Sequence, residues 1–356
     1  MAAGCINDKV AGAQSAGEGE KLMHLGIFMT NRCSARCAHC GADSSPHASG
    51  RLARRQVGRM LDQAGRMVKR DRVFAVCFSG GEPFLNFTEL AAMIARASRN
   101  GARVSCVTNG FWAVSAAAAR EKLAVLKRAG LDNLVISTDK FHQRFVPLAK
   151  VRTVIAACRE LGIGFGLKYV VTKNGPRLTS LLRQLEDVTA GAEFKIQEIP
   201  CLPAGRAREL PAAAFRYQRG LPGKRCPGQG MLTIDPSGIA YPCCPPAWPK
   251  RLGLGDARTT PLAVLAKKAA TDPLLKLLRR EGPAFLVPYL ELAGTIFARG
   301  RFVEECHLCQ AVMEAIASDP ALEQAVTRAI RAGRDACRLR RRAADTVLAL
   351  FAPKQK

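Results

Sequence analysis

The chain has 356 residues, of which 48% are hydrophobic and 23% charged, which suffices for one barrel-sized α/β domain and a smaller second domain. No apolar run reaches the roughly 18 residues of a transmembrane helix, and the Ala- and Gly-rich residues 1–21 lack the apolar core of a secretory signal, so we expect a flexible N-terminus and a cytoplasmic protein. The 54 Lys and Arg exceed the 29 Asp and Glu by a formal charge of +25, which attracts acidic partners but is equally explained by a solvated basic surface.

Short apolar runs alternate with longer segments of helical periodicity from Leu22 onward. Repeated strand–helix units predict an α/β fold with a parallel sheet and right-handed crossovers. Six strands are too few for a closed eight-stranded barrel, so we expect a partial (β/α)6 barrel, open on one side, over residues 22–205. The predicted strands are Met23–Met29, Val73–Phe78, Arg103–Val107, Asn133–Ile136, Gly164–Val171 and Glu193–Ile199, and the predicted helices are Ala53–Lys69, Thr88–Asn100, Ser115–Ala129, Leu148–Leu161 and Arg177–Val188.

The pattern changes after Pro200, where Pro and Gly become frequent and cysteines return. We expect a small, loop-rich α+β domain over residues 206–318, with helical structure around Pro261–Arg280. A basic helical tail is expected over residues 319–356. This tail contains a local cluster of arginines, namely Arg338, Arg340, Arg341 and Arg342.

Fourteen cysteines are many for a chain without an export signal. Clustered cysteines are therefore expected to bind metal or to act in redox chemistry rather than to form disulfides. Cys77, Cys106 and Cys158 each stand alone inside an apolar segment. These three are expected to pack in the core as small hydrophobic side chains.

The first cysteine cluster directly follows the first predicted strand and reads Cys33-Ser-Ala-Arg-Cys37-Ala-His39-Cys40. Three thiolates at this spacing can bind three irons of a [4Fe–4S] cluster and leave the fourth iron open. A structural zinc ion would need four ligands. His39 is available as a fourth, but its position next to Cys40 would strain the geometry around a single ion.

A second motif, Gly80-Gly81-Glu82-Pro83, follows the second predicted strand. The glycines would let a ligand approach the backbone closely, and Glu82 offers an acceptor for an ammonium group. An ordinary turn between strand and helix is the alternative. Both motifs stand at the carboxyl ends of consecutive parallel strands, the edge at which barrel sites assemble.

A CxxxCxxC motif followed by GGEP resembles the signature of the radical S-adenosylmethionine (SAM) superfamily. The resemblance implies that Cys33, Cys37 and Cys40 bind a [4Fe–4S] cluster whose open iron takes the amino and carboxylate groups of SAM. It also implies that Gly80–Pro83 receives the SAM amino group. His39 matches a position at which the family often has an aromatic residue near the adenine.

Polar residues also follow the third and fourth strands. The resemblance suggests that Asn109, in Thr-Asn-Gly, and Ser137 and Asp139, in Ser-Thr-Asp, contact SAM. Ordinary turn chemistry is the alternative for each. His142 lies just beyond and is a candidate for substrate contact or proton transfer.

Four further cysteines have ligand spacing: Cys226 and Cys243 flank Gly238 as Cys-x₁₁-Gly-x₄-Cys, and Cys306 and Cys309 form Cys-x₂-Cys. Four thiolates suit either a second [4Fe–4S] cluster or zinc. The pattern resembles the start of a SPASM domain, which extends many peptide-modifying radical SAM enzymes. A full SPASM domain has further cysteines soon afterwards, and because only Cys337 follows here, the shorter twitch version with one auxiliary cluster is expected.

Cys244 stands beside Cys243, and adjacent side chains rarely bind one cluster because they diverge. Cys244 is expected to be a buried small side chain, the alternatives being that it replaces Cys243 as ligand or that it faces the active site. A thiol of Cys244 or Cys201 there could donate hydrogen to a substrate radical, as radical epimerisation requires.

The resemblance implies an enzyme that a reductase such as flavodoxin or ferredoxin reduces, and that cleaves SAM to a 5′-deoxyadenosyl radical which abstracts hydrogen from a substrate. We expect a ribosomally made precursor peptide as the substrate, with epimerisation or a crosslink as outcome. About 20 residues precede the barrel, so a leader peptide is expected to bind the barrel, the basic tail or a separate peptide-recognition protein.

The sequence also allows two functions other than peptide modification. The first is radical modification of a small molecule such as a tetrapyrrole or a sugar. The second is a non-catalytic metal or iron–sulfur protein that binds nucleic acid. Gly80–Pro83 argues against the second, because nucleic-acid binding needs no ammonium-binding turn beside three cysteines, and no aromatic and basic RNA-binding motif is visible.

Overall fold

The computed structural model describes residues 23–67, 74–226, 230–244, 249–297 and 300–333. Strands and helices alternate through the first two hundred residues, as the sequence predicts. The strands of this part are β1 (Met23–Phe28), β2 (Phe74–Ser79), β3 (Ala102–Thr108), β4 (Asn133–Ser137), β5 (Gly164–Val171) and β6 (Lys195–Pro200). The helices are α1 (Arg54–Met67), α2 (Phe87–Arg99), α3 (Ala116–Ala129), α4 (Leu148–Glu160) and α5 (Leu178–Thr189).

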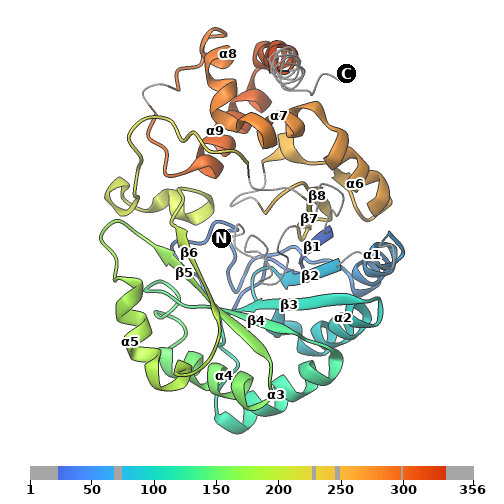
Figure 1. Cartoon of the computed structure of the whole chain (residues 1–356), viewed down its shortest axis with the longest axis vertical. Helices are drawn as coiled ribbons and strands as arrows, with labels where there is room; N and C mark the ends of the chain where they lie inside the picture. Colours follow the sequence, from blue (N-terminus) through green and yellow to red (C-terminus); the bar gives the residue numbers. More distant parts are fainter. Residues whose placement is uncertain (1–22, 68–73, 227–229, 245–248, 298–299, 334–356) are drawn as a thin grey trace, which may run out of the picture.

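The six strands are parallel neighbours in sequence order, and α1–α5 cover one face of the sheet (Figure 1). This confirms the predicted α/β class with a parallel sheet. Local signals in the sequence define the ends of α3: Gly130 follows it in a left-handed conformation (φ 97°), and the Gly130 N–H donates to carbonyls of the last turn. At the start of the same helix, the Ser115 side chain accepts a hydrogen bond from Ala118 N–H.

The sheet continues beyond β1 with β7 (Met231–Ile234), β8 (Ile239–Tyr241) and β9 (Gly255–Asp256), in the order β6-β5-β4-β3-β2-β1-β7-β8-β9. β7 is parallel to β1, whereas β8 and β9 are added antiparallel. The expected second domain therefore contributes strands to the sheet of the first. Gly26 permits this pairing, because a Cβ there would lie 3.1 Å from the Thr233 hydroxyl.

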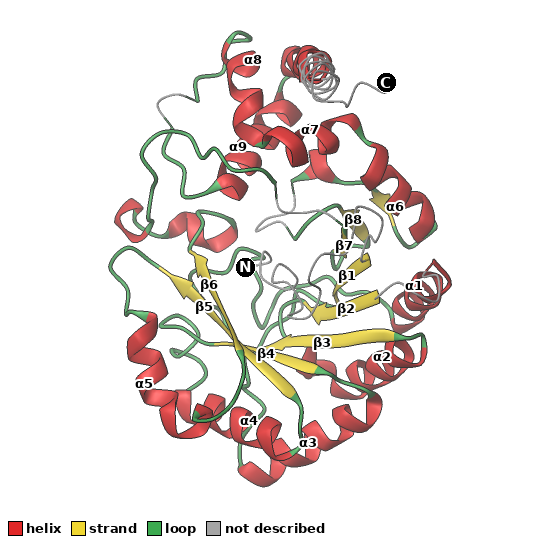
Figure 2. Ribbon diagram, in the orientation of Figure 1, coloured by secondary structure: helices red, strands yellow, loops and turns green. Residues whose placement is uncertain are grey.

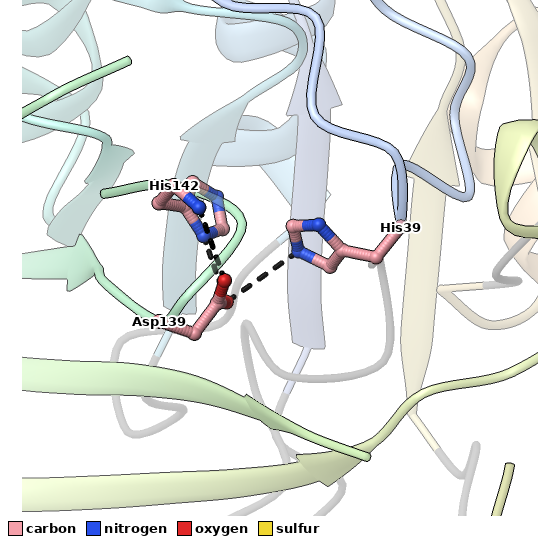
Figure 3. Close-up of side chains that lie close together, drawn as sticks. All are labelled: His39, Asp139 and His142. Atoms are coloured by element: carbon pink, nitrogen blue, oxygen red, sulfur yellow. Dashed lines mark hydrogen bonds and ion pairs between the residues drawn. The ribbon is translucent and has the colours of Figure 1, made fainter. Parts of the chain in front are cut away.

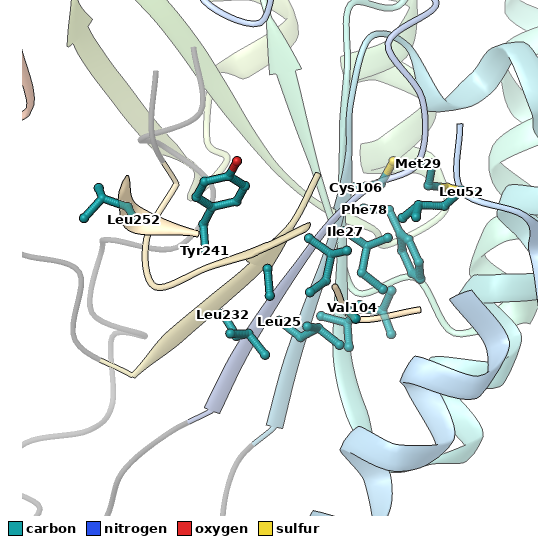
Figure 4. Packing of buried hydrophobic residues seen from close by; sticks show 14 of the residues in the cluster. Leu25, Ile27, Met29, Leu52, Phe78, Val104, Cys106, Leu232, Tyr241 and Leu252 are labelled. Carbon is teal, nitrogen blue, oxygen red and sulfur yellow. The ribbon is translucent and has the colours of Figure 1, made fainter. Parts of the chain in front are cut away.

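A single large hydrophobic cluster fills the space between the sheet and the helices (Figure 4). Leu25 and Ile27 of β1, Phe78 of β2 and Val104 of β3 are almost fully buried there, as expected for parallel strands covered by helices. Burial of such a side chain stabilises the fold by roughly 1.5–3 kcal/mol. Cys77, Cys106 and Cys158 are buried, as predicted.

The C-terminal part is mainly helical and lies at the opposite end of the molecule from α3–α5 (Figure 2). The helices predicted around Pro261–Arg280 are present as two separate helices. The second is distinct because the Asp272 side chain caps it at Leu275 N–H and Pro273 begins it. Residues 320–333 are also helical. The helices are α6 (Leu262–Thr271), α7 (Pro273–Glu281), α8 (Val287–Glu291) and α9 (Glu305–Ser318), and the short 3₁₀ helices are η1 (Pro83–Asn86), η2 (Gly205–Glu209), η3 (Ala212–Ala214), η4 (Lys250–Leu252) and η5 (Pro283–Leu286).

The predicted flexible residues 1–21, Cys337 and the arginine cluster at 338–342 lie outside the described residues. Among the described helices, none combines the length and the apolar character that crossing a membrane requires.

Candidate functional site

A cavity lies at the carboxyl ends of the barrel strands, where the sequence motifs converge. Its empty space, including space open to solvent, is about 600 Å³. The residues that line it come from the loops after β1 to β4 and from β5. Among them are Cys33, Cys37, Cys40, Ser79, Gly80, Gly81, Thr108, Asn109, Ser137, His142 and Lys168.

The first cysteine cluster forms a tight loop that presents all three thiols to this cavity. The three cysteines are buried, and backbone N–H groups point at two of the sulfurs: Ala35 N–H at Cys33 Sγ (3.5 Å) and Ser44 N–H at Cys40 Sγ (3.3 Å). Burial raises the pKa of Cys33 to about 12 and also raises that of Cys37. The thiols of Cys33 and Cys37 are therefore protonated at neutral pH until a metal displaces their protons.

The fold itself also requires the glycines of the second motif, and their contact with a ligand stays a prediction. Gly80 has φ +140°, and a Cβ on Gly81 would lie 2.1 Å from the carbonyl oxygen of Arg32. Gly81 N–H also donates to Thr30 C=O at 2.6 Å. The backbone that approaches the glycines is the chain's own segment before Cys33, so they lock the second motif onto the cysteine loop.

Glu82 is completely buried and ties the end of β2 to the end of β3. Its carboxylate accepts hydrogen bonds from Phe84 N–H (3.1 Å), Thr108 Oγ1 (2.9 Å) and Asn109 N–H (2.8 Å). Burial outweighs these bonds and raises the pKa of Glu82 to about 7. Glu82 and Pro83, the first residue of η1, lie behind the residues that line the cavity. The contact of Glu82 with an ammonium group stays a prediction.

The loop after β3 approaches the cysteines directly. Asn109 Nδ2 is 3.1 Å from Ser34 Oγ and 3.7 Å from Cys33 Sγ. Ser137, at the end of β4, lines the same cavity. The structure thus brings together Asn109 and Ser137 with the cysteine loop, as the sequence predicts from their positions at strand ends.

Asp139 stands between two imidazoles (Figure 3). Its Oδ2 atom lies 2.8 Å from His142 Nδ1 and 3.5 Å from His39 Nε2, and the two imidazole rings hold the pKa of Asp139 below its usual range although burial opposes this. His39 is buried and stacks on Phe141, with ring centroids 4.5 Å apart. His142 lines the cavity, whereas Asp139 and His39 lie behind it. The contacts of Asp139 and His39 with SAM stay predictions.

Lys168 is a residue that sequence reasoning missed. It lies in the middle of β5, is 3% exposed and lines the cavity. The available signal was a lysine inside the apolar strand Gly164–Val171, because a buried strand tolerates a charge only where it has a partner or a function. Lys168 brings an ammonium group to the cavity wall.

The second cysteine group is also assembled by the fold. Burial raises the pKa of Cys243, and the charges of Cys309, Cys226, Cys244 and Cys306 add to this. Burial also raises the pKa of Cys309, with a contribution from Cys226. These cysteines therefore lie in one region of the fold. Cys306 and Cys309 lie on α9, and Cys243 follows β8.

Cys244 belongs to a different environment from Cys243. Its Sγ lies 2.9 Å from Met231 Sδ and 3.5 Å from Thr233 Oγ1, and it packs in a small cluster with Met231 and Phe28. Phe28 lines the cavity. Cys201, directly after β6, is 3% exposed, and burial raises its pKa to about 11, with a smaller contribution from Asp139.

The donor set at the cavity fits the cofactor that the motifs imply. Three buried thiols, with N–H groups directed at two of the sulfurs, match a [4Fe–4S] cluster bound by three cysteines. A parallel α/β barrel with such a site at the carboxyl ends of its strands defines an iron–sulfur enzyme of the radical SAM class. Residues 27–174 match the family model of the Radical SAM superfamily. These residues therefore form a radical SAM domain, the domain of enzymes that use a [4Fe–4S] cluster and SAM.

Several known proteins are similar to this chain. YydG of Bacillus subtilis, whose name assigns it provisionally to peptide biosynthesis, is 25% identical over 264 residues, covering 72% of this chain and 81% of that protein. The Fe-coproporphyrin III synthase of Methanosarcina barkeri is 27% identical over 152 residues, 42% of this chain and 37% of that one. The GTP 3′,8-cyclase of Rhodopirellula baltica is 33% identical over 140 residues, 37% and 36% of the two chains.

Among solved structures, native anSMEcpe with bound AdoMet has a TM-score of 0.53 at 16% identity, over 88% of this chain and 99% of that one. At this level of identity the likeness concerns the fold. It extends well beyond residues 27–174, because it covers 88% of this chain.

Proposed function

We propose that this radical SAM enzyme modifies a ribosomally made peptide. The observation that carries the proposal is the similarity to YydG, which spans 72% of this chain and therefore includes residues beyond the barrel. The formal charge of +25 supports it, because an acidic leader segment would be attracted over a long range. A reductase such as flavodoxin or ferredoxin and a precursor peptide are the proposed partners.

The cavity residues receive roles by their chemistry. Cys33, Cys37 and Cys40 would hold the [4Fe–4S] cluster, which together with SAM would supply radical chemistry for hydrogen abstraction from the substrate. Gly80 and Gly81 place backbone groups beside the SAM methionine end. Asn109 and Ser137 supply the remaining polar contacts of the SAM site.

Lys168 and His142, two side chains of the cavity wall, complete the site. Lys168 places an ammonium group in the cavity, where the SAM carboxylate is the matching anion. His142 donates its Nδ1 proton to Asp139, which leaves Nε2 as the nitrogen available to a substrate. His142 is therefore positioned to hold or accept a proton at Nε2.

Cys226, Cys243, Cys306 and Cys309 are proposed to bind one auxiliary [4Fe–4S] cluster in a twitch-like domain. The mutual influence of their charges supports this, because a cluster needs four thiols that converge from separate segments. Zinc is the alternative metal. Iron and zinc analysis of the anaerobically purified protein distinguishes them.

The thiol of Cys244 or Cys201 is proposed to complete an epimerisation. The thiol would give a hydrogen atom to the substrate carbon radical and become a thiyl radical, which one electron from the reductase and one proton would restore. Cys244 is favoured by its packing against Phe28, a residue of the cavity wall. In D₂O, Cys244→Ala or Cys201→Ala should still form 5′-deoxyadenosine yet lose deuterated product; normal turnover of both variants would favour a crosslink.

The test of the whole proposal is SAM cleavage with and without peptide. Reconstituted protein with SAM and dithionite should form 5′-deoxyadenosine, and the triple variant of Cys33, Cys37 and Cys40 to Ala should not, while the second metal site stays occupied. Absence of 5′-deoxyadenosine from the wild-type protein would contradict the assignment. A peptide encoded beside the gene should change in mass or stereochemistry. Turnover of a tetrapyrrole or a sugar in its place would establish the small-molecule alternative.

A further inference from the structure

Arg206 is a buried arginine beneath the loop that carries the three cysteines. Its side chain is 5% exposed, although arginine is almost never fully buried unless it is paired. It lies on η2, in a segment far from the cysteines in sequence. The burial of the Arg206 side chain therefore needs a structural explanation of its own.

The guanidinium bonds the cysteine loop at three points. Nη1 donates to the carbonyl of Cys37 (2.8 Å), and Nη2 donates to the carbonyl of Ser44 (2.9 Å) and pairs with the carboxylate of Asp43 (2.8 Å). The backbone N–H of Arg206 bonds the carbonyl of Cys40 at 3.0 Å. Arg206 thus holds the chain on both sides of Cys40.

The surrounding backbone is built for this contact. Asp43 has φ 54°, a left-handed conformation that a non-glycine residue adopts at an energetic cost. Gly205 has φ +54°, and a Cβ there would lie 2.4 Å from the carbonyl oxygen of Gly41. The loop and η2 therefore meet backbone to backbone, with Arg206 as the side chain that closes the contact.

The charge of Arg206 is only partly cancelled. Its one anionic partner, among the described residues, is Asp43, whose side chain is 70% exposed, so solvent screens that carboxylate. The guanidinium itself stays in a poorly solvated place, with Nη1 only 2.8 Å from the backbone carbonyl oxygen of Cys37. A buried cation beside a group of thiolates favours the more negative state of whatever they bind.

We propose that Arg206 is a positioning residue that fixes the cysteine loop and, through its charge, raises the reduction potential of the [4Fe–4S] cluster that Cys33, Cys37 and Cys40 hold. Net charge is one of the factors that set such potentials. The inference rests on the proposed assignment of these three cysteines. It concerns how readily the site accepts the electron, which the three ligands alone do not determine.

The test compares Arg206→Met, which removes the charge, with Arg206→Lys, which keeps it. The control is Arg208→Met, because Arg208 lies on the same short helix but is exposed and pairs with Glu314 on α9. The readouts are iron content and the midpoint potential of the EPR signal that changes on addition of SAM. Activity is not needed for either readout.

We expect Arg206→Met to shift the midpoint potential to more negative values or to lose the iron of this site, and Arg206→Lys and Arg208→Met to keep iron and a potential close to wild type. Wild-type potential and iron in Arg206→Met, or an equal change in the Lys and Met variants, would overturn the inference. A wild-type protein with no SAM-sensitive signal would instead contradict the proposed function, and the inference with it.

Discussion

The Oδ2 atom of Asp139 lies 3.5 Å from Nε2 of His39, and both side chains are completely buried. Burial lowers the pKa of His39 to about 3, although the charge of Asp139 acts in the opposite direction. The folded protein therefore keeps His39 neutral over a range of pH in which the unfolded chain binds a proton.

This difference makes stability depend on pH. The free energy of unfolding should fall between pH 7.5 and 5.5, because His39 takes up a proton only in the unfolded state; this residue contributes about 1 kcal/mol to that fall. In His39→Phe, which keeps a planar ring against Phe141, the fall should be smaller by that amount. Denaturant unfolding at both pH values measures it. The exposed His47→Phe serves as control, and an unchanged pH response in His39→Phe would contradict the prediction.

Glu82→Gln should destabilise the protein by about 1–3 kcal/mol. The two carboxylate oxygens accept N–H groups of Phe84 and Asn109 separately, so the amide nitrogen of Gln must face one of these donors. Glu160→Gln, which removes an exposed ion pair with Arg120, should cost less than about 1 kcal/mol. Equal stability of the two variants would refute this account. If Glu82 also receives the SAM ammonium group, SAM affinity falls about ten- to a hundredfold.

Lys168→Met should weaken SAM binding about ten- to a hundredfold, because it removes a charge-assisted contact worth roughly 1.5–3 kcal/mol. Equilibrium binding of SAM to protein with full iron content measures the effect. Lys127→Met is the control, since Lys127 lies on α3 and its ammonium bonds the carbonyl of Gly162 on the exposed surface. Unchanged affinity in Lys168→Met would exclude Lys168 from the SAM site.

Cys309→Ala should lose the metal of the proposed auxiliary site and keep the iron proposed to bind at Cys33. Cys244→Ala should keep the metal at both sites, because the Cys244 side chain turns toward Met231. This holds although Cys244 is the neighbour of the proposed ligand Cys243. Iron and sulfide analysis of the two variants gives the answer. Iron loss in Cys244→Ala equal to that in Cys309→Ala would make Cys244 a ligand instead of Cys243.

The sequence was informative wherever one local pattern determined one local structure. The period of apolar residues located the six strands of the barrel, and β5 was predicted with the bounds Gly164–Val171 that the structure has. The strand-end motifs were predicted to converge, since parallel strands bring their carboxyl ends to one edge. Asn109 and Ser137 line the cavity for that reason.

Features that depend on contacts between distant segments were not predictable. The pairing of β7 with β1 has no local signal, and the role of Gly81 follows from the position of Arg32, which only the folded chain reveals. Lys168 and Arg206 stand singly, without a motif. Their significance comes from burial, which a lone charged residue in a sequence does not disclose.

The parallel pairing of β1 with β7 has a consequence for how the protein is made. His24 of β1 pairs with Met231 of β7, which is synthesised about 200 residues later. One edge of β1 therefore stays unpaired until the ribosome has made β7. Such distant pairing makes folding slow. A fragment that ends near residue 205 would expose this unpaired strand permanently, and exposed edges of apolar strands recruit other chains. The isolated barrel should therefore aggregate when expressed, even though it contains every cysteine of the first site.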